Sequence, residues 1–229
     1  MCGRFSRRMT TEEIAESFEA GQILCDLEPS YNVAPSQDVV AIINGEDKKL
    51  VTFKWGLIPY WSKDPSVGYK MINARAESIS EKPSFKLPLK SKRCLIIADG
   101  FYEWRKEQGN KIPMFFHLKS HKPFGFAGLY DNWTSIDGEK ISTCTIITTD
   151  ANELMKQIHY RMPVILPKEK ESIWIDSNIH DIDILLPILK PYDSNLMEMY
   201  EVSRFVNSPK NNSKECIQPI QLFSNKPAF

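Results

Sequence analysis

Short apolar runs, each ended by turn-forming residues, are the feature of this sequence that most limits its fold. The runs at 39–43 and 50–55 flank a polar Asn-Gly-Glu-Asp turn, and the run at 94–98 is typical of a buried strand. Helical patterns are few and short, and the best of them begins at a capping box at 10–13. The sequence therefore predicts an α+β fold with a mostly antiparallel, barrel-like β core flanked by short helices.

The rest of the chain follows the same pattern without an internal repeat or a linker. Two helices are expected between 168 and 189, and a short helix capped by Asp150 is expected before them. We expect a single domain over residues 1–220 and a polar tail over 221–229. Further strands are predicted at 101–104, 114–118, 124–129, 142–148 and 200–206.

Charge and hydropathy exclude several classes of protein. The 29 basic and 29 acidic residues balance, which argues against a generally basic coat for nucleic acid but permits a local basic groove. No apolar run approaches the ~18 residues of a membrane span, and the start of the chain lacks the apolar core of a signal peptide. We therefore expect a cytoplasmic protein.

The five cysteines are odd in number, widely spaced and without a C-x-x-C pair, which argues for a reducing compartment. Cys2 is unusual because removal of Met1 would leave it with an α-amine and a thiol on adjacent carbons. The amine titrates near ~8, and in its neutral form it can attack an aldehyde. The thiol can then close a five-membered ring on the same carbon. Taken alone, the position of Cys2 favours a flexible start of the chain over a reactive residue.

Polar side chains interrupt three apolar segments. In an extended chain Asn73, Arg75 and Glu77 would share one face, which is also what a solvated strand does. Glu103 lies between aromatic residues, where desolvation suits a carboxyl to proton transfer unless the strand face is exposed. His159 precedes an apolar run, and histidine is the usual acid or base near neutral pH, although a lone histidine is often structural.

Together Cys2, Asn73, Glu103 and His159 form a set suited to nucleophilic catalysis. No metal and no cofactor are expected, because the four histidines show no ligand spacing and no carboxylate cluster accompanies them. The remaining three histidines are interpreted as structural: His117, His121 and His180.

Tyr60 and Trp61 stand in a loop beside Ser62 and Lys63 rather than in a strand. Exposed aromatic rings near cations stack single-stranded bases while the cations hold the backbone. Trp55, in the preceding strand, is interpreted as core. The loop therefore favours contact with single-stranded nucleic acid.

Six ordered motifs, spread over roughly residues 2–220, resemble the SRAP family, named for SOS response-associated peptidase. They are Cys2-Gly3-Arg4-Phe5, Tyr31-Asn32-Val33-Ala34-Pro35, Trp55-Gly56-Leu57-Ile58-Pro59, Asn73-Ala74-Arg75-Ala76-Glu77, Asp99-Gly100-Phe101-Tyr102-Glu103-Trp104 and His159-Tyr160-Arg161-Met162-Pro163.

The resemblance implies a sensor of abasic sites in single-stranded DNA that cross-links to the site through the N-terminal cysteine. It implies that Asn73 positions the amine or the sugar, that Glu103 relays protons, and that His159 acts on the sugar oxygen and in reversal. It also implies activity on the chain's own Met1 and a lyase activity. The implied DNA-binding residues are Arg4, Pro35, Trp61, Arg75 and Arg161.

The chain departs from the pattern of some bacterial members in two places. Pro83 stands where those members carry a further arginine, so that Lys82 or Lys86 would have to replace one phosphate contact. Only one aromatic residue, Trp61, follows the Pro59-Tyr60 turn, where some relatives have two.

Two other functions remain open from the residues. A cysteine peptidase acting on other proteins would use Cys2 without forming an adduct with DNA. A non-covalent reader of modified bases would survive loss of Cys2 and depend on Trp61 and Arg75. The expected partner is single-stranded DNA containing abasic sites, bound by a monomer that associates with the nucleoid only through DNA.

Overall fold

The computed structural model of the chain describes residues 2–45 and 47–220, so that Met1 and the tail predicted at 221–229 lie outside the described residues. Its larger sheet closes on itself, because β5 and β11 pair in parallel at Lys54–Thr143 and Trp55–Cys144. The closed ring has five strands: β4 (Asp38–Ile43), β5 (Lys49–Trp55), β7 (Arg93–Ala98), β10 (Phe124–Thr134) and β11 (Lys140–Asp150).

Three shorter strands extend this barrel at its edges. β2 (Gln22–Ile23) pairs with β5, while β6 (Asn73–Arg75) and β12 (Arg161–Pro163) both pair with β11. Because β6 and β12 flank one strand, residues 73 and 161 are brought to the same end of the barrel although they are far apart in sequence.

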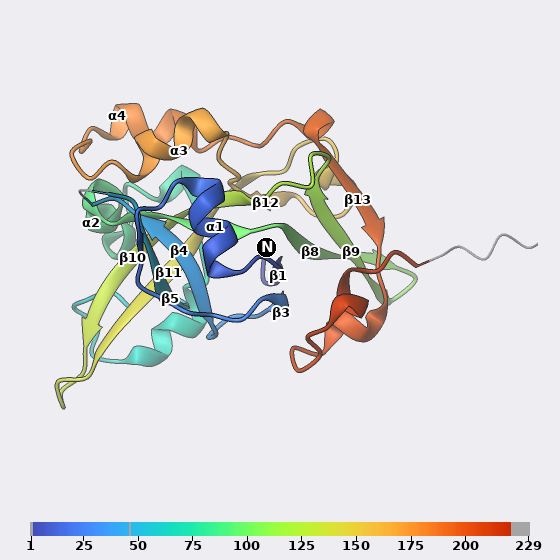
Figure 1. Cartoon of the computed structure of the whole chain (residues 1–229), viewed down its shortest axis with the longest axis horizontal. Helices are drawn as coiled ribbons and strands as arrows, with labels where there is room; N and C mark the ends of the chain where they lie inside the picture. The colour runs from blue at the N-terminus through green and yellow to red at the C-terminus, as the bar shows by residue number, and fades with distance from the viewer. Residues whose placement is uncertain (1, 46, 221–229) are drawn as a thin grey trace, which may run out of the picture.

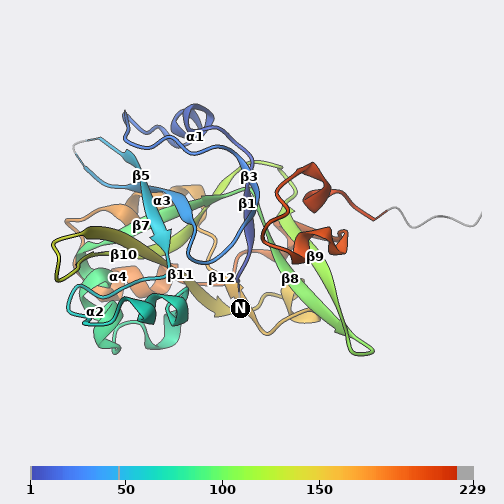
Figure 2. The same ribbon diagram turned by 90° about the horizontal axis from the view of Figure 1, so that it is seen from below.

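A second, five-stranded antiparallel sheet stands beside the barrel, with β1 and β3 between the barrel and the outer strands (Figures 1 and 2). β8 and β9 form a hairpin whose turn carries positive φ angles at Gln108 and Gly109. The strand order is β13–β9–β8–β1–β3: β13 (Met197–Glu201), β9 (Asn110–Leu118), β8 (Gly100–Glu107), β1 (Phe5–Arg7) and β3 (Ser30–Val33).

Alternation along the barrel strands divides the core in two. On β7, Cys94 and Ile96 face a cluster shared with Cys2, whereas Leu95 and Ile97 face the opposite cluster. Four short helices cover the latter face, since their buried residues belong to that cluster or pack against it. They are α1 (Thr11–Phe18), α2 (Pro83–Ser91), α3 (Lys168–Ile175) and α4 (Ile182–Leu185).

The predicted capping box is confirmed: Thr10 Oγ1 accepts from the Glu13 amide at 3.2 Å, and Glu13 Oε2 accepts from the Thr10 amide at 2.9 Å. The helix predicted from Asp150 is wrong. Only a 3-10 turn forms at Met155–Gln157, and Asn152 Oδ1 accepts from the Met155 amide at 2.9 Å. The Asp150 carboxylate instead pairs with an arginine described below.

The last strand ends earlier than predicted. β13 stops at Glu201, and a 3-10 turn at Arg204–Asn207 replaces the rest, capped by Ser203. The α+β class with a barrel-like antiparallel core is confirmed. None of the described helices is long and apolar enough to cross a membrane.

Candidate functional site

Cys2 is fully buried at the start of the chain, three residues before β1. The Asn73 side chain on β6 donates from Nδ2 to the Cys2 carbonyl at 2.9 Å. Asn73 Oδ1 is also buried and has no hydrogen-bond partner in the described part of the chain. The amide therefore holds the start of the chain with one end and keeps an acceptor for a ligand at the other.

Glu103 lies on β8 and is 6% exposed. Burial, and then the nearby Glu103 carboxylate, raise the pKa of the Cys2 thiol well above its usual range. The two side chains share a face of the molecule, because Phe101, two residues before Glu103, belongs to the same core cluster as Cys2. The resting thiol is consequently protonated.

His159 joins Glu103 in a cavity of ≈ 490 Å³. Its Nδ1 accepts a hydrogen bond from the Arg161 amide at 3.0 Å, so the neutral ring carries its proton on Nε2. The ring stacks on Tyr160 with 4.5 Å between centroids. The four predicted catalytic residues are thus neighbours in a series. Asn73 is hydrogen-bonded to Cys2, the Glu103 charge acts on the Cys2 thiol, and Glu103 and His159 line one cavity.

Arg161 is 5% exposed and makes internal bonds. Its guanidinium donates to both Glu77 oxygens at 2.7 and 2.9 Å, to Asp150 at 2.9 Å and to the Thr148 carbonyl at 2.7 Å. The strand face predicted for residues 73–77 is interrupted, because a 3-10 turn at Ala76–Ser78 redirects Glu77 toward Arg161. This cluster fixes β12 and, through the Arg161 amide, the tautomer of His159.

Arg4 is also held by the protein. It donates to Asn32 Oδ1 at 2.7 Å and to the Val206 carbonyl at 2.8 Å, and it lies over the Trp104 ring. Burial lowers the pKa of its guanidinium from its ordinary value.

The other predicted DNA-binding residues are more accessible. Arg75 is exposed two residues after Asn73, Pro35 is half-buried, and Trp61 is 53% exposed. The Trp61 loop is fixed beside the β10–β11 hairpin by Trp133, which donates to the Ser62 carbonyl at 2.7 Å. Pro83 begins α2, and the two lysines predicted to replace the missing arginine, Lys82 and Lys86, are both exposed.

Sequence reasoning missed two lysines at the cavity of Glu103 and His159. Lys106 and Lys111 line it, are exposed, and face each other across the β8–β9 hairpin. Like charges directly opposite on neighbouring strands are destabilising, and an anion between them would offset that cost. The sequence signal was a pair of lysines flanking a turn. It indicates two facing cations only once the register of β8 and β9 is known.

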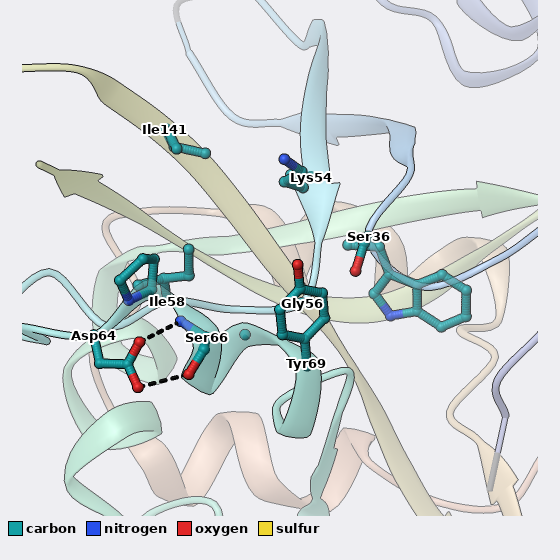
Figure 3. Close-up of a pocket in the computed structure, with 11 residues that line it drawn as sticks. Ser36, Lys54, Gly56, Ile58, Asp64, Ser66, Tyr69 and Ile141 are labelled. Atoms are coloured by element: carbon teal, nitrogen blue, oxygen red, sulfur yellow. Dashed lines mark hydrogen bonds between the residues drawn. The ribbon is translucent and has the colours of Figure 1, made fainter.

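A second cavity of ≈ 360 Å³ is lined by Trp55 and by the turn that contains Asp64 and Ser66. Figure 3 shows the Tyr69 ring between Ser36 and the turn in which Asp64 accepts hydrogen bonds from Ser66. Lys54 stands at the same cavity. Tyr69 is 72% exposed. The cavity therefore presents an accessible aromatic ring together with the Lys54 cation, next to Ser36, which follows Pro35 in the chain.

These features define a class of α+β proteins in which a buried cysteine near the start of the chain is held by an amide and lies near a carboxylate, which shares a cavity with an imidazole. The chain belongs to the SOS response associated peptidase (SRAP) family, whose model matches residues 1–209. The resemblance in the motifs is thereby confirmed.

Relatives at several distances carry the same description. The chain is 54% identical over 222 residues to "Abasic site processing protein YoqW" of Bacillus subtilis, covering 95% of this chain and 99% of that protein. It is 34% identical over 228 residues to "Abasic site processing protein HMCES" of Gallus gallus, covering 85% and 67%. A crystal structure of a Bacteroides thetaiotaomicron protein superposes with a TM-score of 0.88 at 31% identity, covering 95% and 99%.

Proposed function

We propose that this protein recognises abasic sites in single-stranded DNA and captures them covalently through Cys2 once Met1 has been removed. The observation that carries the proposal is the placement of Cys2, whose carbonyl is held by Asn73 and whose thiol lies within the field of Glu103. The names of the relatives, abasic site processing proteins, support the same substrate.

The chemistry follows from two adjacent nucleophiles meeting one aldehyde. The Cys2 amine attacks C1′ of the ring-opened sugar, and loss of water gives a Schiff base. The thiol sulfur then bonds to the same carbon while the thiol proton passes to nitrogen, which closes a thiazolidine. No oxidant or reductant is needed. A neutral thiol suits this order, because the amine must react first and the cationic imine then favours the thiolate.

The neighbouring side chains supply the proton transfers. Glu103 accepts a proton from the attacking amine and returns it to the departing water. His159, with its proton on Nε2, donates to the sugar oxygen during ring opening and assists reversal. A lyase activity would arise instead from the Schiff base, if C2′ lost a proton and the 3′-phosphate departed before the thiol closed the ring. The free Oδ1 of Asn73 accepts from the amine or from a sugar hydroxyl.

Exposed cations would hold the phosphates. We assign this role first to Arg75, Lys106 and Lys111, which surround the cavity or flank Asn73 and are open to solvent. We also propose Arg4 and Arg161 as phosphate contacts, but as weaker ones, because each would have to break hydrogen bonds within the protein. Trp61 and Pro35 would shape the bent strand through ring stacking and steric contact.

Met1 removal by the chain itself fits the same residues, with Cys2 as nucleophile. The alternative of a peptidase acting on other proteins would also use Cys2, but it would turn over a peptide substrate without forming an adduct with DNA. We propose a cytoplasmic monomer that meets the nucleoid only through damaged strands.

Intact mass spectrometry tests the proposal. Purified protein should lack Met1, and incubation with a single-stranded oligonucleotide carrying one abasic site should add the mass of the oligonucleotide less one water. Cys2→Ala should abolish the adduct, whereas Cys25→Ser, at a half-buried cysteine elsewhere, should keep it. A Cys2→Ala protein that forms the adduct as well as wild type would overturn the proposal.

A further inference from the structure

Three metal-ligating groups meet on the five-stranded sheet, on the face away from Cys2. His117 is the second-last residue of β9, His121 follows in the turn, and Glu198 lies on β13 directly opposite His117. Phe116, next to His117, belongs to the core cluster of Cys2, whereas Phe115 belongs to the cluster on the opposite face. Strand alternation therefore places His117 on the face of the sheet opposite to Cys2.

The ligand atoms of the three residues converge. Glu198 Oε1 lies 3.4 Å from Nε2 of His117 and 3.9 Å from Nε2 of His121, and all three atoms lie within 4.8 Å of one another. Both contacts are longer than the ~2.7–2.9 Å of a charge-assisted hydrogen bond. A zinc ion with bonds of about 2.0–2.2 Å to nitrogen and oxygen would fit between them after small movements.

The tautomer of His117 is set for a ligand. Its Nδ1 lies 2.9 Å from the Leu118 carbonyl, which can only accept, so Nδ1 carries the proton and the neutral ring turns the lone pair of Nε2 toward Glu198. A metal-bound histidine commonly donates its other ring N–H to a backbone carbonyl in this way. His117 is buried, and its ring packs against Phe115 and Tyr200.

The turn brings the second histidine over the first at a conformational cost. His121 has φ 55°, in the left-handed region that side chains other than glycine seldom adopt. Its ring stacks on His117 with 4.9 Å between centroids. The side chains of His121 and Glu198 are 71% and 45% exposed, so both can move the remaining distance to a shared ion.

We propose that His117, His121 and Glu198 form a site for a divalent transition-metal ion, zinc by preference, that ties β9 and its turn to the edge strand β13. Imidazole and carboxylate ligands suit zinc, and three protein ligands leave a fourth position for water. β13 leads into the 3-10 turn whose Asn207 accepts from Trp104 Nε1 at 2.8 Å and lines the cavity of Glu103. By holding β13 in place, the ion would thus stabilise the position of Asn207 in the wall of that cavity.

The sequence did not predict this site, because Glu198 is distant in the chain and the histidines were interpreted as structural. Only the β9–β13 register places the carboxylate beside them.

Titration calorimetry of the full chain, stripped with a chelator and titrated with ZnCl₂, tests the site. We expect one ion per chain, and binding at least about tenfold weaker in both His121→Ala and Glu198→Gln, which alter exposed side chains. His180→Ala is the matched control, since His180 has the same Nδ1 contact to a carbonyl, at Lys90, outside the cluster. It should bind zinc as wild type does.

Zinc should also raise the melting temperature of wild type by about 5 °C or more at a hundredfold excess over the Kd, and not that of Glu198→Gln. No zinc binding by wild type, equal binding by wild type, His121→Ala and Glu198→Gln, or loss of binding in His180→Ala would each overturn the proposal. Adduct formation with DNA is a separate reaction, so failure of either proposal leaves the other measurable.

Discussion

The side-chain amide of Asn73 donates a 2.9 Å hydrogen bond to the carbonyl of Cys2, across 71 positions of the chain. This contact fixes the start of the chain to β6, which in turn pairs with barrel strand β11. A buried acceptor such as Asn73 Oδ1 costs ~1–3 kcal/mol when it has no partner. A ligand hydroxyl or amine at this position would recover that cost, and the first prediction follows from it.

Asn73→Ala should slow adduct formation by about 10- to 100-fold, because the amine of Cys2 would lose its orientation toward the aldehyde. The rate is measured by gel shift of an abasic oligonucleotide under single-turnover conditions. Asn195→Ala, at an exposed site in the 3-10 turn Ser194–Leu196, should react at the wild-type rate. An unchanged rate in Asn73→Ala would contradict the assigned role.

Glu103→Gln should lower the pKa of the Cys2 thiol, because the second cause that raises it is the Glu103 charge. The pKa would stay above its ordinary value, since burial, the larger cause, remains. The pH profile of Cys2 alkylation, followed by mass spectrometry, should therefore move to lower pH. Adduct formation should nevertheless become slower, since the proton acceptor is gone. Faster adduct formation would show that thiol acidity, and not proton transfer, limits the reaction.

Glu77→Gln should remove part of the loss of stability in acid. The hydrogen bonds from Arg161 hold the pKa of Glu77 below its usual range, so the folded pKa is depressed. Its contribution is present above the ordinary pKa and is lost as pH falls through the folded pKa. Urea unfolding between about pH 5 and pH 3 should show a shallower decline in the variant. The effect is modest, because the Glu77 side chain is 50% exposed and screened by solvent.

Arg161→Met should cost ~2 kcal/mol of unfolding free energy, since hydrogen bonds to charged groups are lost at a buried position. Arg75→Met, at an exposed position, should leave stability within ~0.5 kcal/mol. Chemical denaturation at neutral pH measures both. Equal stability of the two variants would show that the internal network around Arg161 is weaker than its geometry indicates.

Lys106→Gln and Lys111→Gln should each reduce the salt dependence of binding to an abasic single strand. Each phosphate contact on a single strand contributes a slope of about 0.7, and the neutral net charge suits roughly 3 to 5 contacts in all. Fluorescence anisotropy with Cys2→Ala protein reports non-covalent binding over a salt series. Lys214→Gln, on a 3-10 turn away from the cavity, is the control. Slopes equal to wild type in the hairpin variants would remove these lysines from the interface.

The barrel strands could be predicted, and Asn73, Glu103 and His159 could be proposed as candidates, because each has a local signature. Short apolar runs and turn residues mark β4, β5 and β7, and reactive side chains interrupt apolar segments at Asn73, Glu103 and His159. What could not be predicted depends on partners distant in sequence. Glu77 meets Arg161 across 84 positions, and this occupies the guanidinium that sequence reasoning assigned to phosphate.

The other pairs of residues that the sequence did not predict depend on the register between neighbouring strands. Lys106 faces Lys111, and His117 faces Glu198, only because of how the strands align. A pattern of single residues contains no information about these pairings until the neighbouring strand is known. The helix predicted from Asp150 failed for a related reason, since Arg161 engages the carboxylate that would have capped it.

The parallel pairing of β5 with β11 has a kinetic consequence. It joins Lys54 to Thr143 and closes the ring of strands across a long stretch of chain, a contact that is slow to form because loop-closure entropy must be overcome first. β6 and β12 attach to the same strand β11, so Asn73 and Arg161 reach their final positions only when that strand is in place. The hairpins can form early, but the candidate site around Asn73 is completed last. A refolding chain should therefore regain strand content before it regains the capacity to react with DNA.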